Sequence, residues 1–225
     1  MKPGLILLLL LIGCIFIAWI FTIIEPSDSP FAPTPSNLSE VVIREYEGEK
    51  LNDISDFREN SIKGPQKVDI ESYRLSITGL VKEPRMYSYQ DILEFPHYQK
   101  VVTLHCVEGW DVTLLWEGIE VRDLLTLSKI DKQANTIIFH GEDGYSTSFP
   151  LSYIMDNPIL MAYKMNNQTI KRERGFPFQL VAEDKWGYKW IKWISGIELT
   201  SDNTYKGYWE TRGYSNSGDL NKEFF

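Results

Sequence analysis

The chain has 225 residues, of which 23 are lysine or arginine and 31 are aspartate or glutamate, so its formal net charge is −8. Binding to nucleic-acid phosphates requires clustered basic side chains, and the acidic balance therefore argues against nucleic acid as the partner. The 43% hydrophobic and 24% charged content is that of an ordinary globular protein.

A long apolar stretch lies near the start of the chain. Residues 5–24 carry no charge, and a helix of about 20 residues spans about 30 Å, the thickness of a bilayer core. Lys2 precedes this stretch and no further basic residue occurs before Arg44, so the positive-inside rule places the following chain outside the cytoplasm. We expect residues 1–24 to be an uncleaved single-pass anchor in the cell membrane. A lipid-modified Cys14 and a cleaved signal peptide are the alternatives.

The segment after the apolar stretch differs in composition from the rest. Residues 25–40 contain four prolines and several serines, which favours an extended tether over packed structure. Residues 41–225 are enough for one domain with a sizeable core. Short strand patterns and short helix patterns follow one another there without a regular βαβ rhythm, which predicts an α+β fold.

The expected elements of this domain are all short. Alternating polar and apolar side chains predict a strand over residues 72–79 that ends at Gly79. Ser88 is a typical N-cap for a helix over residues 88–95, which Pro96 ends. The other expected elements are strands over residues 99–104, 136–140, 178–181 and 190–199, helices over 120–127 and 151–155, and a turn over 142–145.

Cys106 is the cysteine of the predicted domain, because the chain has two cysteines and Cys14 lies in the apolar stretch. It follows the strand pattern of residues 99–104 and begins a short polar segment. Three interpretations are open at this point: an inert buried thiol, a nucleophile, or a soft ligand for one metal centre. Three histidines and the lack of a Cys-x-x-Cys pair leave a zinc site undersupplied.

Two polar segments far from Cys106 in the sequence could work with it. One covers residues 56–64, and the other covers residues 171–192, where lysines and arginines alternate with glycines. The basic side chains supply donors for an anionic group, and glycines permit close backbone approach. Either segment is also typical of a solvated charged surface. Together with a thiolate, the two predict a phosphate-bearing cofactor whose metal accepts sulfur.

Several segments together carry a family resemblance: Cys106–Trp110, Trp116–Gly118, Val121–Leu125, Arg174–Leu180, Lys185–Lys192 and Gly207–Tyr214. In this order they resemble the molybdopterin-binding oxidoreductases of the sulfite oxidase superfamily. The resemblance runs from about Phe57 to Asp219, which is nearly the whole predicted domain. Within the superfamily, the sequence is most similar to the catalytic subunits of protein-methionine-sulfoxide reductases.

The resemblance implies a sulfite-oxidase-type fold of mixed sheets and short helices with one molybdenum–molybdopterin cofactor per chain. Cys106 would be the thiolate ligand of the metal and the catalytic residue. The last four residues of the following list would bind the terminal phosphate through backbone N–H groups and lysine charge. The other implied cofactor contacts are Arg58, Glu59, Asn60, Gly141, Arg174, Gln179, Lys189, Trp190, Ile191 and Lys192.

The implied reaction is a two-electron transfer of one oxygen atom. Sulfite oxidases place arginines just after the ligand cysteine to hold the sulfite anion, whereas residues 107–111 contain none. Reduction of a neutral sulfoxide, or of a related S- or N-oxide, is therefore the favoured direction. The alternatives are sulfite oxidation, which needs an arginine from Arg58 or Arg172, and a non-catalytic binding module that keeps the fold.

Two further departures from the family bear on these expectations. Gln179 stands where the family usually has arginine, and the neighbouring cluster of Lys171, Arg172 and Arg174 would compensate for it. The start of the chain lacks the twin-arginine signal that is typical of exported relatives. We also expect a separate electron-transfer partner, a membrane haem protein or a quinone-linked one, because the chain has no haem or iron–sulfur ligation pattern.

Overall fold

The computed structural model describes residues 41–225. The anchor and tether expected at residues 1–24 and 25–40 lie outside the described residues. Within residues 41–225, none of the helices combines the length and the apolar character that a membrane crossing requires.

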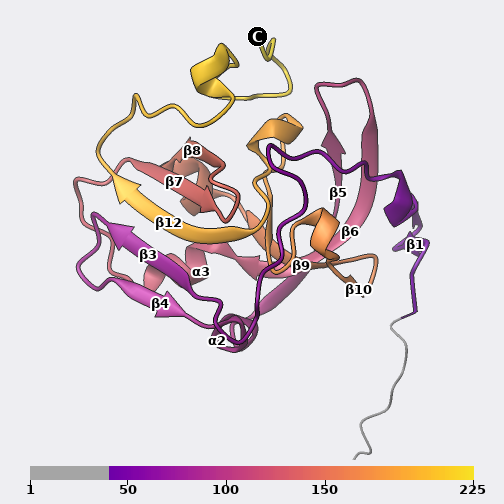
Figure 1. Ribbon diagram of the computed structural model, residues 1–225, viewed down its shortest axis with the longest axis horizontal. Helices are drawn as coiled ribbons and strands as arrows, with labels where there is room; N and C mark the ends of the chain where they lie inside the picture. The colour runs from indigo at the N-terminus through magenta and orange to yellow at the C-terminus, as the bar shows by residue number, and fades with distance from the viewer. Residues whose placement is uncertain (1–40) are drawn as a thin grey trace, which may run out of the picture. The chain divides into compact units, whose positions relative to one another are not determined.

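Two five-stranded sheets form most of the fold (Figure 1). The first has the strand order β10-β9-β6-β5, with β11 also paired to β9, and each of these pairs is antiparallel. Its strands are β5 (His97–His105), β6 (Asp111–Glu120), β9 (Leu160–Met165), β10 (Gln168–Thr169) and β11 (Gln179–Val181).

The second sheet is mixed and has the strand order β4-β3-β12-β7-β8. Strand β12 runs parallel to β3 and antiparallel to β7. The strands of this sheet are β3 (Leu75–Gly79), β4 (Arg85–Tyr87), β7 (Thr136–Gly141), β8 (Ser146–Pro150) and β12 (Ile194–Thr200). A separate small hairpin joins β1 (Glu45–Tyr46) to β2 (Glu49–Lys50).

The helices are short and lie between the strands. The α-helices are α2 (Tyr89–Leu93), α3 (Val121–Thr126) and α4 (Leu151–Asp156), and the 3-10 turns are η1 (Ile54–Asp56), η2 (Arg172–Arg174), η3 (Gly187–Lys189) and η4 (Glu210–Arg212). Helix α2 begins as predicted, because the Ser88 side chain accepts from the Asp91 backbone while the Asp91 carboxylate accepts from the Ser88 backbone. This capping box satisfies two backbone donors that the first turn cannot satisfy.

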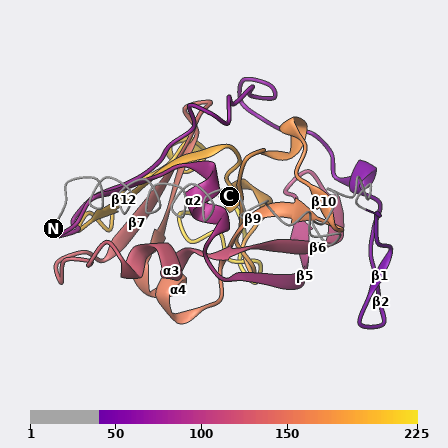
Figure 2. The same cartoon turned by 90° about the horizontal axis from the view of Figure 1, so that it is seen from below.

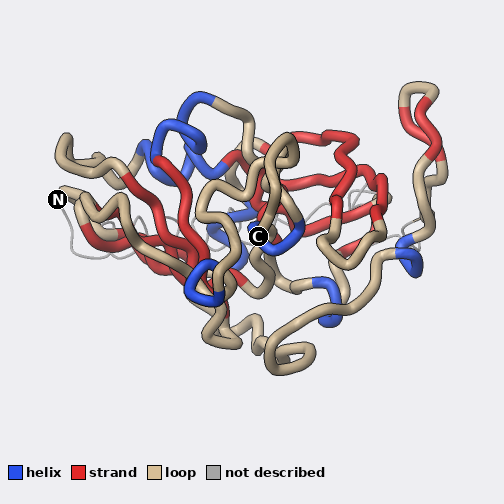
Figure 3. Tube along the Cα trace, turned by 90° about the horizontal axis from the view of Figure 1, so that it is seen from above, coloured by secondary structure: helices blue, strands red, loops and turns tan. Residues whose placement is uncertain are grey.

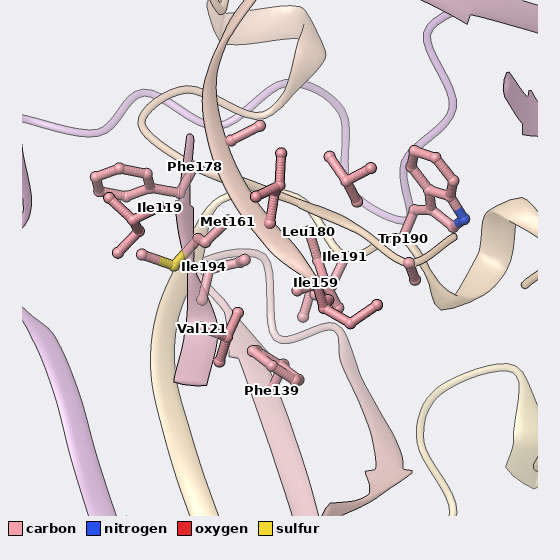
Figure 4. Packing of buried hydrophobic residues seen from close by; sticks show 14 of the residues in the cluster. Ile119, Val121, Phe139, Ile159, Met161, Phe178, Leu180, Trp190, Ile191 and Ile194 are labelled. Carbon is pink, nitrogen blue, oxygen red and sulfur yellow. The ribbon is translucent and has the colours of Figure 1, made fainter. Parts of the chain in front are cut away.

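The hydrophobic core joins the inner faces of both sheets. Figure 4 shows Ile119 and Met161 from the first sheet close to Phe139 and Ile194 from the second. All four are fully buried, and burial of such a side chain contributes roughly 1.5–3 kcal/mol. The loops that connect the sheets are therefore held on a rigid base.

Most of the expected elements are confirmed, and so is the α+β class with mixed sheets. The strand expected over residues 72–79 is β3, which ends at Gly79 as predicted, and the helices expected over 120–127 and 151–155 are α3 and α4. The strand expected over residues 190–199 was placed too early, because residues 187–189 form a 3-10 turn and β12 begins at Ile194.

Two segments without regular strands bring distant parts of the chain together. In Figure 1, the chain after β2 passes from the side of β5 and β6 to α2, and the last segment lies beyond β7 and β8. Figure 2 shows the same cartoon from below, and Figure 3, seen from above, shows loops gathered around the C-terminus. The C-terminal segment is attached to β8, because the Tyr208 amide donates to the Ser146 carbonyl at 2.9 Å.

Candidate functional site

A cavity of about 280 Å³ lies where these loops meet the end of the first sheet. Five segments distant in sequence line it: the loop after η1, the turn after β5, the turn between β7 and β8, the region from β11 to β12, and the C-terminal segment. The lining residues are Phe57, Arg58, Asn60, Ser61, Ile62, Leu104, Cys106, Val107, Glu108, Trp110, Asp143, Tyr145, Gln179, Gly187, Tyr188, Trp190, Ile191, Lys192, Trp193, Trp209 and Tyr214.

Cys106 reaches this cavity from a tight turn between β5 and β6. Its amide donates to the Trp110 carbonyl at 2.9 Å, and its carbonyl accepts from the Gly109 amide at 3.0 Å. Gly109 has a φ of 82°, a conformation that glycine adopts without strain. Gly187 packs beside the turn, where an added Cβ would lie 3.1 Å from the His105 carbonyl oxygen. The backbone thus fixes the position of the thiol.

The surroundings of Cys106 act on the pKa of its thiol in both directions. Burial raises the pKa of the Cys106 thiol, and the Glu108 carboxylate adds to this effect. Hydrogen bonds from the Glu108 backbone and the Asn60 side chain, and the charge of Arg58, act in the opposite direction on the pKa. A soft metal cation bonded to the sulfur would stabilise the thiolate outright.

Glu108 is the centre of a small network beside the thiol. One carboxylate oxygen accepts from the Asn60 side-chain amide at 3.0 Å, and the other accepts from the Trp110 indole N–H at 3.1 Å. The loop after η1 and the turn after β5 are therefore joined directly. Because Glu108 is exposed, its carboxylate also connects the cavity with solvent.

Three buried polar atoms near the cavity have no hydrogen-bond partner within the described part of the chain. They are the Ser61 hydroxyl, the Gln179 Oε1 atom and the Arg174 Nη1 atom. Ser61 and Gln179 line the cavity. Arg174, which was also predicted as a site residue, lines a second cavity instead, and its guanidinium lies 5.1 Å from the centre of the Phe57 ring. Buried polar groups are nearly always hydrogen-bonded in folded proteins, so the atoms of Ser61 and Gln179 fit a polar ligand bound beside Cys106.

The structure brings most of the predicted site residues to this cavity. Those that line it are Arg58, Asn60, Cys106, Gln179, Trp190, Ile191 and Lys192. Glu59 is adjacent, because its carboxylate lies 3.4 Å from the Lys192 ammonium. Gly141 is also adjacent, and an added Cβ there would lie 2.9 Å from the Lys192 carbonyl oxygen. The polar loop, the thiol and the cationic segment therefore meet as the sequence predicted.

Lys189 differs from the prediction. Its ammonium group is fully buried and donates to the Glu210 carboxylate at 2.6 Å, to the Ser148 carbonyl at 2.8 Å and to the Asn216 carbonyl at 3.0 Å. A lysine ammonium has three donors, so none remains for a phosphate.

The backbone donors of the same segment are also in use. The amides of Lys189, Trp190 and Ile191 donate to the carbonyls of Trp186, Gly187 and Lys189. The expected phosphate contact through these three N–H groups is therefore not supported. Lys192 keeps its ammonium group at the cavity.

Aromatic residues form a part of the wall that the sequence did not reveal. Tyr145, Tyr188, Trp209 and Tyr214 line the cavity. The Tyr145 hydroxyl donates to the Tyr188 carbonyl at 2.5 Å, and the Tyr188 hydroxyl donates to the Ser215 carbonyl at 2.8 Å. The motif at residues 207–214 carried the family resemblance, but nothing in it indicated a position in the site.

Asp143 is a further residue of the cavity wall that the sequence analysis did not identify as functional. It lies on the turn between β7 and β8, and its side chain is buried. Burial raises the pKa of its carboxyl group, while Lys192 and Lys63 lower it. The cavity thus holds an acid group whose proton is retained to higher pH than usual.

Comparison with known proteins identifies the family of this domain. The family described as "Oxidoreductase molybdopterin binding domain" matches residues 62–209. The chain is 33% identical over 156 residues to the uncharacterized oxidoreductase YuiH of Bacillus subtilis, covering 69% of this chain and 78% of that protein. It is 28% identical over 170 residues to the protein-methionine-sulfoxide reductase catalytic subunit MsrP of Campylobacter jejuni, covering 68% of this chain and 57% of that protein.

More distant relatives share the same domain. The chain is 28% identical over 182 residues to the sulfite oxidase of Arabidopsis thaliana, covering 64% of this chain and 46% of that enzyme. The sulfane dehydrogenase SoxCD from Paracoccus pantotrophus has a similar fold, with a TM-score of 0.61 at 21% identity over 86% of this chain and 58% of that one. The chain therefore spans about half the length of several relatives. The predicted membership of the sulfite oxidase superfamily and the predicted sulfite-oxidase-type fold are confirmed.

Proposed function

Because this chain belongs to the oxidoreductases with a molybdopterin-binding domain, in the sulfite oxidase superfamily, we propose that it reduces a neutral sulfoxide or a related S- or N-oxide by removing one oxygen atom. The observation that carries this proposal is a cavity in which the buried Cys106 thiol meets the unpartnered polar atoms of Ser61 and Gln179. The relative named MsrP supports a sulfoxide as substrate.

The residues at the cavity fit a molybdenum–molybdopterin group. Cys106 offers one soft sulfur ligand, and no cluster of three or more His, Cys, Asp or Glu that could hold a metal occurs among residues 41–225. Ser61 and Gln179 would satisfy polar atoms of the pterin end, and Lys192 would face its phosphate. When bound, this group supplies two-electron redox chemistry and the uptake or release of one oxygen atom.

The chain itself orients the substrate and moves protons. Reduction of a sulfoxide breaks one S–O bond and consumes two electrons and two protons, so the oxygen leaves as water. We assign proton transfer to Glu108, because its carboxylate is exposed at one side and is held beside Cys106 by Asn60 and Trp110. General acid catalysis requires a positioned carboxyl group near the reacting atom, and these two hydrogen bonds hold the Glu108 carboxylate in one position at the cavity.

The aromatic part of the cavity wall supports a neutral substrate. Four aromatic residues, Tyr145, Tyr188, Trp209 and Tyr214, form one part of it. Aromatic rings make favourable contacts with sulfur and with apolar substituents. A sulfoxide with an alkyl side chain presents both.

Sulfite oxidation is the second candidate, and one observation favours it. Arg58 lines the cavity, and its positive charge acts on the pKa of Cys106, so one guanidinium is available to an anion. Arg172, the other arginine considered for this purpose, is exposed and does not line the cavity. The negative Glu108 carboxylate also lies at the place where the anion would enter, and like charges there disfavour sulfite.

We further propose that residues 1–24 anchor the chain in the cell membrane, that residues 25–40 form a tether and that the domain of residues 41–225 works outside the cytoplasm. The uncharged stretch of residues 5–24 supports the anchor. A separate redox protein would deliver the electrons, and a membrane haem protein or a quinone-linked protein fits this position. The relative from Campylobacter jejuni is named a catalytic subunit, which supports such a partner.

Metal analysis and a paired assay test the proposal. The full chain, purified from a host that makes molybdopterin, should contain molybdenum in a ratio of about one per chain. With a reduced viologen dye as the electron donor, it should convert methionine sulfoxide to methionine. Metal-free protein from such a host would refute the proposal. Oxidation of sulfite by the oxidised protein without sulfoxide reduction would favour the second candidate instead.

A further inference from the structure

The C-terminal segment of residues 207–218, which we call the C-terminal strap, completes the wall of the cavity. Trp209 and Tyr214 of the strap line it, and their rings are 5.1 Å apart between centroids. The Tyr214 ring is also 5.1 Å from the Tyr188 ring. The strap contains one 3-10 turn, η4, and its remaining course is loop (Figure 3). Contacts with other segments must therefore hold these two rings in place.

The strongest of these contacts is the buried ion pair between Lys189 and Glu210. Both side chains are fully inaccessible to solvent. The Thr147 hydroxyl donates to the same Glu210 oxygen at 2.8 Å, and the Lys189 ammonium also binds carbonyls of Ser148 and Asn216. One lysine thus connects η3, strand β8 and the strap.

Close packing around this ion pair leaves the strap little freedom. An added Cβ at Gly207 would lie 2.2 Å from the Ser146 carbonyl oxygen and 2.7 Å from Glu210 Oε2. An added Cβ at Gly218 would lie 2.5 Å from Lys189 Cγ. Both ends of the strap are therefore seated against the ion pair or its immediate neighbours.

We propose that Lys189 and Glu210 form a latch that holds Trp209 and Tyr214 in the cavity wall and thereby sets which substrates fit. The part concerning substrates rests on the proposed function. Lys189 and Glu210 are positioning residues, since neither lines the cavity. Burial lowers the pKa of Lys189 while Glu210 raises it, so the charged lysine depends on its partner.

The latch predicts a specific kinetic pattern. Loosening the strap displaces two rings of the wall but leaves Cys106, Asn60 and Glu108 unchanged, because these belong to other segments. Weaker contact with the non-reacting part of the substrate raises KM, whereas the chemical step is retained. A large sulfoxide should be affected more strongly than a small one, because it needs more of the wall.

The experiment compares Glu210→Gln with Glu183→Gln in the full, molybdenum-loaded chain. Glutamine keeps the shape of residue 210 and removes its charge. Glu183 pairs with Lys100 away from the strap and is partly exposed, so it serves as the matched control. We expect Glu210→Gln to raise KM for methionine sulfoxide by about tenfold, with kcat changed less than about threefold. KM for dimethyl sulfoxide should change less, and Glu183→Gln should behave as wild type.

Amide hydrogen exchange gives a readout that does not depend on turnover. The amides of Tyr208 and Tyr214 are bonded to the carbonyls of Ser146 and Trp209, and their exchange should accelerate by about tenfold or more in Glu210→Gln. Unchanged exchange would overturn the latch. Accelerated exchange with an unchanged KM for methionine sulfoxide would overturn its role in substrate fit.

A second variant keeps the test decisive if Glu210→Gln does not fold. The double substitution Lys189→Met with Glu210→Met replaces the buried ion pair by apolar side chains, a change that folds are known to tolerate. It also removes the bonds to Ser148 and Asn216, so the same change in exchange and KM is expected. If wild-type protein holds molybdenum but reduces neither sulfoxide, the proposed function fails, whereas the exchange measurement still decides the latch.

Discussion

Two sets of residues around the same cavity satisfy their hydrogen bonds in opposite ways. Ser61 and Gln179, the polar set, each keep a buried polar atom without a partner in the described chain. In the aromatic set of Tyr145, Tyr188, Trp209 and Tyr214, the buried hydroxyls are paired, as Tyr145 donates to Tyr188 and Tyr188 to Ser215. The difference indicates where a polar cofactor belongs and where the protein itself completes the wall.

The difference also has an energetic meaning. A buried polar atom left unpaired costs about 1–3 kcal/mol, so a ligand that pairs with the polar set would stabilise the protein. The aromatic set is held by the buried ion pair of Lys189 and Glu210, in which Glu210 Oε1 is paired whereas Glu210 Oε2 is buried without a partner in the described chain. Substitutions in the polar set should therefore change cofactor retention more than stability, and those supporting the aromatic set should do the reverse.

Cys106 is the residue at which we expect the largest effect, because it would supply the soft sulfur ligand of the cofactor that the polar set would bind. Replacing Cys106 by serine removes the soft sulfur ligand and changes the side-chain volume little. We expect sulfoxide reduction to fall below about one-thousandth of the wild-type rate, equivalent to about 4 kcal/mol. Thermal unfolding should be nearly unchanged, and retained turnover would refute the ligand assignment.

Two lysines in one short segment provide the next largest contrast. Replacing Lys189 by alanine leaves Glu210 buried without its cation, and should lower the free energy of unfolding by about 3 kcal/mol. Replacing Lys192 by alanine removes a longer pair, at 3.4 Å, between the largely buried Lys192 and the more exposed Glu59, and should cost less, about 1 kcal/mol. Denaturant unfolding measures both values.

Molybdenum content should rank the same two variants differently. Lys192→Ala should retain less molybdenum than wild type, because it lines the cavity. The folded fraction of Lys189→Ala should retain it, because this ammonium is already bonded within the protein. If both variants changed the free energy of unfolding and the molybdenum content equally, the polar set and the aromatic set could no longer be distinguished.

A substitution at Gln179 tests the polar set, and we expect it to stabilise the metal-free protein. Its Oε1 atom is buried without a partner, so replacement by leucine should raise the free energy of unfolding of the metal-free protein by about 1 kcal/mol. The same variant should retain less molybdenum. Gln99→Leu is a suitable control, because Gln99 is exposed and pairs with Glu117 at the surface. A loss of stability in Gln179→Leu would contradict the assignment of this atom to a ligand.

The polar part of the site could be predicted from the sequence because chemistry and local pattern coincide there. Cys106 ends a strand pattern, and the segments at residues 56–64 and 171–192 combine charged side chains with glycines. Such residue types point to an anionic cofactor even before their positions are known. The structure then showed that they meet at one cavity.

The aromatic part could not be predicted, because seven Trp and twelve Tyr occur throughout the chain and suit a core equally well. Lys189 and Lys192 also stand in one basic motif, and nothing local distinguishes them. The distinction arises in three dimensions, where the 3-10 turn η3 directs Lys189 to strand β8 and Glu210. Long-range contacts of this kind leave no periodic signal in a sequence.

Substitution of Asp143 should have the smallest effect on stability. The sign of the pH dependence of this effect tests whether the Asp143 carboxyl group is buried in the cavity wall. Burial raises the pKa of its carboxyl group in the folded protein, whereas the unfolded value is about 3.9. Above pH ~3.9 the unfolded chain loses this proton first, so wild-type stability falls as pH rises through the window up to the folded pKa. Replacing Asp143 by asparagine should remove that loss.

The expected difference in stability between Asp143→Asn and wild type is therefore confined to pH values above the unfolded pKa. Asp143→Asn and wild type should have equal stability below about pH 4, and the variant should be the more stable protein near neutral pH. Asp91→Asn is the control of opposite sign. Hydrogen bonds from Ser88 lower the pKa of Asp91, so this carboxylate stabilises the fold above its unfolded pKa and its removal should lower stability at neutral pH. Equal signs for the two substitutions across this range would show that the Asp143 carboxyl is solvated, and it would then not belong to the closed wall of the cavity.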